Sequence, residues 1–271
     1  MAAFRASVVQ LSAGPDKTTN LARALRWIDR AHAAGAKLVV LPENFLFRGT
    51  DREFKDVPET LAGPSCAALS ERAKLRNLHV LAGSFAEKIP GSSKTYNTSC
   101  LIGPRGQMLA VYRKIHLFDV DLPGKKIRES DRCAKGKKPV LGRMRIGGRE
   151  LRCGLSICYD LRFPELYRQY ARQGADLMFV PSNFTRQTGQ DHWEPLVRAR
   201  AIENQCFVLA PGQSGVGSQG VLTHGNSLIV DPWGRILTKA SGSGEALLTA
   251  RLDMAELVHV RRILPALSEA F

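Results

Sequence analysis

The sequence has no apolar run long enough to cross a membrane, no internal repeat and no low-complexity tract. A helix that spans a bilayer needs about 20 consecutive apolar residues. The N-terminal segment, MAAFRASVVQ, has the character of a strand and lacks the apolar core and the cleavage site of a secretory signal peptide. We therefore expect a soluble, cytoplasmic protein with no membrane partner.

The six cysteines are spread along the chain without any CxxC pair, which argues against a disulfide framework and against a zinc ribbon. No two of His116, His192 and His224 have the HxxxH spacing of zinc ligands on a helix. We interpret these histidines as structural hydrogen-bonding groups. The sequence therefore predicts neither a metal ion nor another cofactor.

Linkers are also missing, because no Gly/Ser-rich, Pro-rich or acidic run interrupts the chain for long. At 271 residues the chain could form one large α/β domain or two small ones. Without a linker, a single domain over residues 1–271 is the better interpretation.

The net charge is strongly positive, at +14. Residues 125–152 contain eleven Lys and Arg against three Asp and Glu, and so hold more than half of the excess. This segment has no interleaved aromatic residues and no helix-turn-helix or zinc-finger pattern, so we expect no nucleic-acid partner. A solvated basic face is the commonest explanation of such a segment, and electrostatic steering of a small anionic substrate is the next.

The hydrophobic pattern predicts strands that alternate with helices, together with antiparallel hairpins. The strand at 37–41 is too apolar to face water, which indicates a sheet that is covered on both faces. We therefore expect two mixed sheets, each covered on its outside by helices. Strands are predicted at 4–11, 37–41, 78–85, 96–102, 107–112, 139–146, 149–157, 176–180, 206–210, 221–230, 236–239 and 246–252, and helices after Pro15-Asp16 up to Gly35 and at 64–77, 164–173, 191–204 and 254–263.

Three reactive side chains follow predicted strands. Cys158 falls where a buried strand meets a helix that starts at Pro164, and helix amides beyond such a corner favour the reactive thiolate. Glu43 lies at the carboxyl end of a strand, where sites gather in α/β sheets, and Lys114 follows another strand. Taken singly, Cys158 could also be an unreactive buried thiol, Glu43 an exposed loop carboxylate and Lys114 a surface cation.

Two loops are further candidates for the walls of a site. The segment 119–138 is rich in charge, Gly and Pro, and it is too long for a passive connection. It contains Glu129. The loop 182–185 follows another predicted strand and contains Asn183 and Thr185.

The chain resembles the nitrilase (carbon-nitrogen hydrolase) superfamily in several motifs that occur in the same order. The motifs are LPEN at 41–44, YRKIH at 112–116, ICYDLRFPE at 157–165, HWEPLVRARAIEN at 192–204, HGN at 224–226 and DPWG at 231–234. The resemblance implies a four-layer α-β-β-α sandwich and a Glu-Lys-Cys triad.

In the mechanism that this resemblance implies, Glu43 accepts the thiol proton and later activates water, while Cys158 attacks the amide carbonyl. Lys114 then stabilises the oxyanion together with the backbone amide of Tyr159, and Glu129 orients the substrate or the lysine. Ammonia leaves, and water releases the acid from a thioester.

Resemblance to one branch of the superfamily suggests the substrate class. True nitrilases tend to have Cys-Trp-Glu where this chain has Cys158-Tyr159-Asp160. The motifs look closest to the branch that contains deaminated glutathione amidase and omega-amidase, which implies a small anionic amide as substrate. Hydrolysis of deaminated glutathione is the first expectation, and omega-amidase activity or nitrile hydrolysis are the alternatives. Arg162, Asn183 and Thr185 are supporting candidates for binding such a substrate.

The resemblance also implies that the chain forms a homodimer or a larger even homo-oligomer. The alternative of a different class is a basic binding protein that keeps the fold without catalysis. Salt-sensitive binding to polyanions, together with the absence of an unusually reactive thiol, would indicate that alternative.

Overall fold

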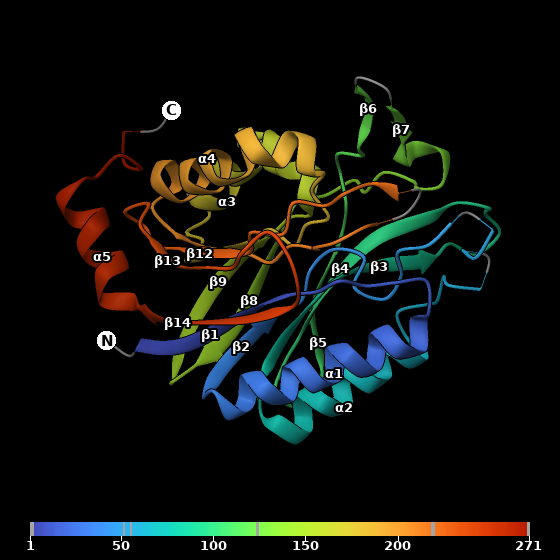
Figure 1. The fold of residues 1–271 in the computed structure, drawn as a ribbon. Helices are drawn as coiled ribbons and strands as arrows, with labels where there is room; N and C mark the ends of the chain where they lie inside the picture. Colours follow the sequence, from blue (N-terminus) through green and yellow to red (C-terminus); the bar gives the residue numbers. More distant parts are fainter. Residues whose placement is uncertain (1–2, 51, 55, 123–124, 218–219, 270–271) are drawn as a thin grey trace.

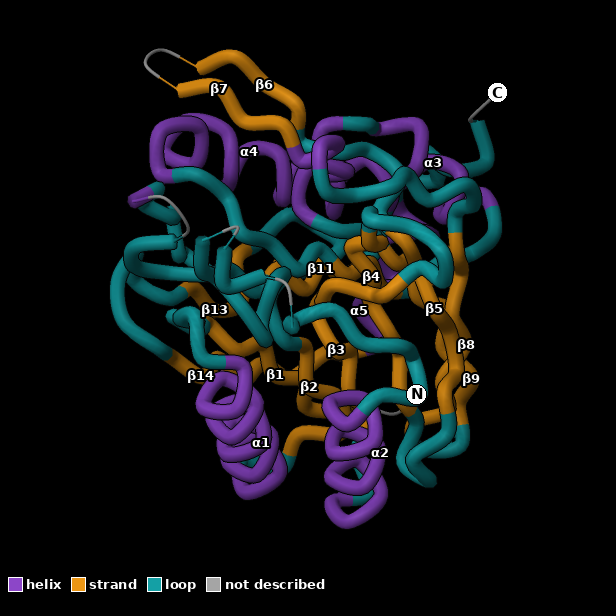
Figure 2. The backbone as a smooth tube through the Cα atoms, turned by 90° about the vertical axis from the view of Figure 1, so that its right-hand side faces the viewer, coloured by secondary structure: helices purple, strands orange, loops and turns teal. Residues whose placement is uncertain are grey.

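The computed structural model describes residues 3–50, 52–54, 56–122, 125–217 and 220–269, and it consists of two facing sheets with helices outside them. Figure 2 shows α1 and α2 on one side of the strands and α3 and α4 on the other. This is the α-β-β-α sandwich that the sequence predicts. In this part of the chain, no helix is long and apolar enough to cross a membrane.

The first sheet has the strand order β14-β1-β2-β3-β4-β5. Strands β1, β2 and β3 are parallel to one another, whereas β14 and β4 pair antiparallel to β1 and β3, and β5 pairs antiparallel to β4. The strands span β1 Ala3–Gln10, β2 Ala36–Val40, β3 His79–Lys88, β4 Thr95–Ile102, β5 Met108–Arg113 and β14 Ala246–Asp253.

The second sheet has the order β13-β12-β11-β10-β9-β8, with β9, β10 and β11 parallel. Its strands span β8 Val140–Ile146, β9 Arg149–Leu155, β10 Leu177–Phe179, β11 Phe207–Ala210, β12 Leu228–Val230 and β13 Ile236–Lys239. In each sheet the three central strands are thus parallel, and their carboxyl ends meet at one edge.

The helices begin and end at residues suited to those positions. Helix α1 (Lys17–Ala33) is capped by Asp16, which accepts a hydrogen bond from the backbone of Thr19. Gly35, with φ of 78°, ends it. The remaining helices are α2 Pro64–Arg76, α3 Pro164–Arg172, α4 Arg186–Asn204 and α5 Met254–Ile263.

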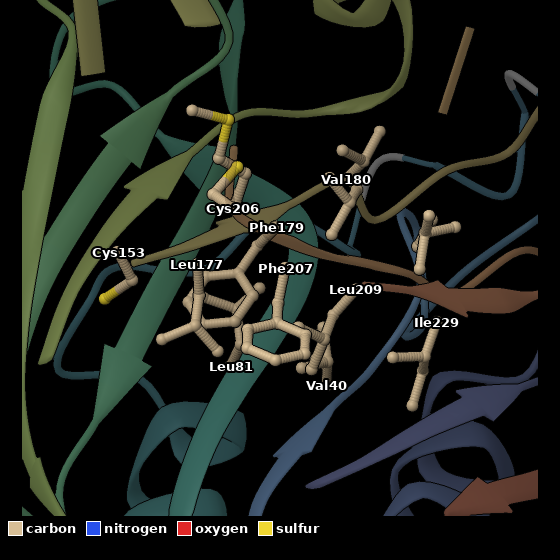
Figure 3. Packing of buried hydrophobic residues seen from close by; sticks show 14 of the residues in the cluster. Val40, Leu81, Cys153, Leu177, Phe179, Val180, Cys206, Phe207, Leu209 and Ile229 are labelled. Carbon is tan, nitrogen blue, oxygen red and sulfur yellow. The ribbon is translucent and has the colours of Figure 1, made fainter. Parts of the chain in front are cut away.

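The core lies between the two sheets. Val40 and Leu81 of the first sheet face Phe179, Phe207 and Leu209 of the second (Figure 3), and all five are buried. A smaller apolar cluster lies beneath α1 and α2. Burial of both faces of β2 from Leu38 to Val40 explains why this part of its sequence is apolar, whereas Lys37 near its start is exposed.

Three predictions about local structure were wrong. Residues 119–138 are not one long loop, because β6 (Asp119–Leu122) and β7 (Lys125–Arg128) pair in a hairpin that projects from the molecule (Figure 1). Helix α4 begins at Arg186 rather than 191, and of the strand predicted at 221–230 only β12 forms. The hairpin was missed because charged residues such as Asp121 and Arg128 in its strands, with Gly and Pro nearby, are typical of a loop.

Gly83 on β3 sets how closely the loop that bears Glu43 approaches the sheet. A Cβ atom at this position would lie 2.0 Å from the carbonyl oxygen of Pro42 and 2.4 Å from that of Leu41. Only glycine therefore allows the backbone of residues 41 and 42 to lie against β3.

We expect Gly83→Ala to lower the free energy of unfolding by about 1 to 3 kcal/mol, because the added methyl group forces two backbones apart. Denaturant unfolding measures this change. Gly14→Ala is the matched control, since a Cβ there has nothing within 4 Å. Equal stability of the two variants would contradict the role given to Gly83.

Candidate active site

Three loops that leave the sheets meet at one cavity of about 500 Å³. Glu43 follows β2, Lys114 follows β5 and Cys158 follows β9, and all three side chains line this cavity. The structure thus brings together the three residues that the sequence singled out. The cavity is also lined by Glu129, Tyr159, Asn183 and Thr185.

Glu43 is 3% exposed, and three donors hold its carboxylate. Its Oε1 accepts hydrogen bonds from Lys114 Nζ at 2.9 Å and from Asn97 Nδ2 at 2.9 Å. Its Oε2 accepts one from the backbone N–H of Asn183 at 2.7 Å. Charge-assisted hydrogen bonds of this kind fix the position of a buried carboxylate.

Lys114 is 2% exposed, and its ammonium lies between two carboxylates. Nζ is 2.9 Å from Glu43 Oε1 and 2.8 Å from Glu129 Oε2. Burial lowers the pKa of Lys114, but the attraction of Glu129 and then of Glu43 more than offsets it, so that the pKa lies well above its usual value. Lys114 is therefore a permanent cation in the cavity.

Cys158 begins a short 3-10 helix, η2 (Cys158–Arg162), and has a left-handed backbone with φ of 48°. Such a conformation costs free energy in a residue other than glycine, and it is typical of functional sites. The backbone N–H of Cys158 donates to the carbonyl of Pro181 at 2.9 Å, which holds the turn against the segment that follows β10.

The pKa of the Cys158 thiol depends on burial and on two charged neighbours. Burial raises the pKa of Cys158 well above its usual range, and the negative charge of Glu43 raises it further, against the opposing pull of Lys114. The helix amides that the sequence analysis expected to favour the thiolate are not among the groups that shift this pKa. The helix that begins at Pro164 starts six residues later, and η2 is too short to replace it.

A buried carboxylate joins the Lys114 loop to the Cys158 loop. Asp160 is fully buried and accepts hydrogen bonds from the hydroxyl of Tyr112 at 2.7 Å and from the backbone N–H of His116 at 3.0 Å. The ring Nδ1 of His116 is 2.7 Å from the same carboxylate. His116 also stacks on Phe163. His116 thus has hydrogen-bonding partners that hold two loops together, as the sequence predicts.

The remaining candidate residues differ in whether they line the cavity. Tyr159, Asn183 and Thr185 line the cavity. Arg162 is not among the lining residues, and it packs instead over the rings of Phe184 and Tyr159, at 5.4 and 5.9 Å from their centroids.

Only a small part of the basic segment 125–152 reaches the cavity. Lys126, Arg128 and Arg132 line it, whereas residues from 140 onward form β8 and β9. Arg128 is paired with both carboxylate oxygens of Asp121, at 2.7 Å each. Most of the positive charge of the segment therefore lies away from the cavity.

Sequence reasoning missed two groups of residues beside the triad. Asn97 on β4 bridges Glu43 and Glu129 through its Nδ2 atom. Gln213 donates to the backbone carbonyl of Glu43 at 2.9 Å and accepts from Arg48 at 3.1 Å. Neither residue is a typical acid, base or nucleophile. The only available signal was the position of Asn97 on a strand next to Lys114.

Within the described residues, no group of three or more His, Cys, Asp and Glu side chains is arranged to hold a metal ion. The groups around Cys158 are instead one ammonium, two carboxylates and several amides. Such a set can accept a proton, attack a carbonyl carbon and stabilise an oxyanion.

Comparison with known proteins identifies the family. The model of the carbon-nitrogen hydrolase family matches residues 5–262. This chain belongs to the carbon-nitrogen hydrolase family. It is 44% identical over 271 residues to the deaminated glutathione amidase of Synechocystis sp., covering 98% of each sequence. It is 38% identical over 270 residues to omega-amidase NIT2 of Bos taurus, covering 99% of this chain and 95% of that one.

A solved structure shows the same fold. The crystal structure of the C. elegans NitFhit protein is 35% identical in sequence and superposes with a TM-score of 0.90. The match covers all of this chain and 66% of the other, so this carbon-nitrogen hydrolase spans about two thirds of the NitFhit chain. The fold and family predicted from the motifs are therefore confirmed.

The geometry predicts that Glu43→Gln makes the Cys158 thiol easier to ionise but lowers the rate of hydrolysis. The thiol of Cys158 should ionise at a lower pH, because a negative charge beside it is removed while Lys114 remains. Hydrolysis should fall sharply at the same time. Ultraviolet thiolate absorbance against pH measures the ionisation, taken as the difference from the same variant with Cys158→Ser.

Glu129→Gln is the control for this measurement. Glu129 contacts Lys114 but is not among the charges that shift the pKa of Cys158, so its removal should change the ionisation much less. Equal changes in both variants would contradict the coupling between Glu43 and the thiol.

Proposed function

We propose that this carbon-nitrogen hydrolase cleaves the amide C–N bond of a small, carboxylate-bearing substrate through a thioester on Cys158. The observation that carries the proposal is the shared cavity, in which a buried thiol lies beside a carboxylate that is held by Lys114. A protonated thiol next to a base can be activated at the moment of attack.

In the first half-reaction, Glu43 accepts the proton of the Cys158 thiol as the sulfur attacks the carbonyl carbon of the amide. The carbonyl oxygen becomes an oxyanion, which Lys114 stabilises. The Tyr159 backbone N–H is a second donor, since it lies in the first turn of η2, where amides lack intrahelical acceptors. The C–N bond then breaks, and Glu43 returns the proton to the departing ammonia.

In the second half-reaction, water attacks the thioester carbon and Glu43 accepts a proton from that water. The C–S bond breaks, the acid leaves and the thiol is restored with the proton that Glu43 held. One carboxylate thus serves both halves, which agrees with its fixed position between Lys114 and Asn183.

The substrate proposal rests on the relatives and on the charges of the cavity wall. The two curated relatives are named for deaminated glutathione and omega-amide hydrolysis, and the identity is higher to the first. Lys126 and Arg132 lie in the cavity wall, together with the aromatic rings of Phe54 and Tyr96. Cations and aromatic faces of this kind suit an elongated acyl group with a carboxylate. Deaminated glutathione is therefore the proposed substrate.

We also propose that the chain acts as one domain and as a homodimer or a larger even homo-oligomer. The family match over residues 5–262 and the apolar core shared by both sheets support the single domain. Subunit pairing rests on family resemblance alone, and analytical ultracentrifugation of the full chain would measure it.

Ammonia release from a panel of amides tests the proposal. The panel contains deaminated glutathione, 2-oxoglutaramate and a nitrile that matches one of the amides. We expect the highest kcat/KM for deaminated glutathione and little release from the nitrile. Preference for 2-oxoglutaramate would establish omega-amidase activity instead, and no release from any amide would contradict the proposal.

Cys158→Ala should lower kcat by about 10⁴-fold or more while the protein stays folded, because the nucleophile is lost. Cys133→Ser is the matched control, since Cys133 is a second thiol in the cavity wall and its side chain is bonded to Thr95 rather than to Glu43. We expect this control to keep most of the activity. Normal turnover by Cys158→Ala would disprove the thioester route.

A further inference from the structure

Asn97 lies near the start of β4 and contacts both carboxylates that flank Lys114, as well as the backbone of Lys114 itself. Its side chain is 5% exposed. Its Nδ2 donates to Glu43 Oε1 at 2.9 Å and to Glu129 Oε1 at 3.0 Å. Its backbone carbonyl accepts from the N–H of Lys114 at 2.9 Å. One residue on a regular strand is thus bonded to both glutamates and to the lysine.

These contacts close a ring of four hydrogen bonds. Lys114 Nζ donates to Glu43 and Glu129, and Asn97 Nδ2 donates to the same two carboxylates. Within this ring each carboxylate has one charged donor, Lys114, and one neutral side-chain donor, Asn97. Each also accepts from one backbone N–H, that of Asn183 for Glu43 and that of Phe118 for Glu129. Asn97 stabilises the two carboxylates without adding a second cation beside the thiol. A second cation there would favour the thiolate form of Cys158.

The amide oxygen of Asn97 argues against a purely structural role. This atom is buried and has no hydrogen-bond partner among the described residues. An unpaired buried acceptor costs free energy of folding, and a structural asparagine normally has partners at both ends of its amide. Here the hydrogen bonds are made only on the side that faces the two glutamates.

We propose that Asn97 is a positioning residue that holds the carboxylates of Glu43 and Glu129 in place relative to Lys114. The proposal rests on the proposed amidase function, in which Glu43 is the base. Asn97 itself does not touch the reacting atoms. It acts by fixing the base and by sharing the two carboxylates with the lysine.

The test is the pH profile of kcat/KM for Asn97→Ala. We expect kcat at neutral pH to fall by about 10- to 100-fold, the size expected from loss of hydrogen bonds to charged groups, with a smaller change in KM. We also expect the acid limb of the profile to move to higher pH, because the carboxylates lose donors that favour their ionised form. A purely structural residue would lower the amount of folded enzyme without moving this limb.

A second readout does not depend on turnover. The difference in unfolding free energy between the unsubstituted protein and Asn97→Ala should shrink as the pH falls, because the lost hydrogen bonds exist only while the carboxylates are ionised. Ser99→Ala is the matched control on the same strand. Its hydroxyl is buried without a partner, so we expect an unchanged profile.

Asn97→Asp is the second variant, since it keeps the size of the side chain and replaces the donor by a third carboxylate. It should fold and lose at least as much activity at neutral pH. Two results would overturn the role of Asn97. One is an acid limb of the kcat/KM profile that does not move in Asn97→Ala, together with a difference in unfolding free energy that does not depend on pH. The other is a kcat of either variant that stays within twofold of that of the unsubstituted protein. Failure of the unsubstituted protein on every amide would refute the proposed function alone, because the stability readout still tests Asn97.

Discussion

The site depends on one buried cation between two carboxylates. Lys114 is almost fully buried, and water therefore cannot compensate its charge. Glu43 and Glu129 do so at 2.9 and 2.8 Å. Removal of one partner from a buried ion pair leaves the other charge uncompensated, which is costlier than loss of a surface pair. This constraint explains why the loops after β2 and β5 and the segment around Glu129 take fixed positions around the cavity.

A second interaction places the thiol relative to this cation. Asp160 follows Cys158 by two residues and is bonded to Tyr112 and His116, which flank Lys114 in sequence. The two sheets therefore meet not only through apolar side chains but also through a buried polar contact at the level of the cavity. Burial and the charge of Glu43 raise the pKa of the thiol, which lies beside the carboxylate that the proposed mechanism uses as its base.

Much of the fold was predictable from the sequence because several central strands contain apolar runs and most helices have a recognisable first or last residue, although the start of α4 was missed. The apolar strand at β2 and the Gly35 that ends α1 are examples. Glu43, Lys114 and Cys158 were predictable as candidates because they follow such strands. The β6-β7 hairpin was not, since its pairing depends on contacts such as Asp121 with Arg128 that join residues on a charged segment. Asn97 was not predictable either, because an amide on a strand has no distinctive pattern.

The central claim is that the sulfur of Cys158 becomes covalently attached to the acyl part of an amide. Mass spectrometry of the enzyme, quenched in acid during turnover of an amide, tests it most directly. The account predicts a mass increase equal to the acyl group without its nitrogen, located on the peptide that contains Cys158 and lost when the protein is treated with hydroxylamine. Rapid turnover with no such adduct, or an adduct on another residue, would contradict it.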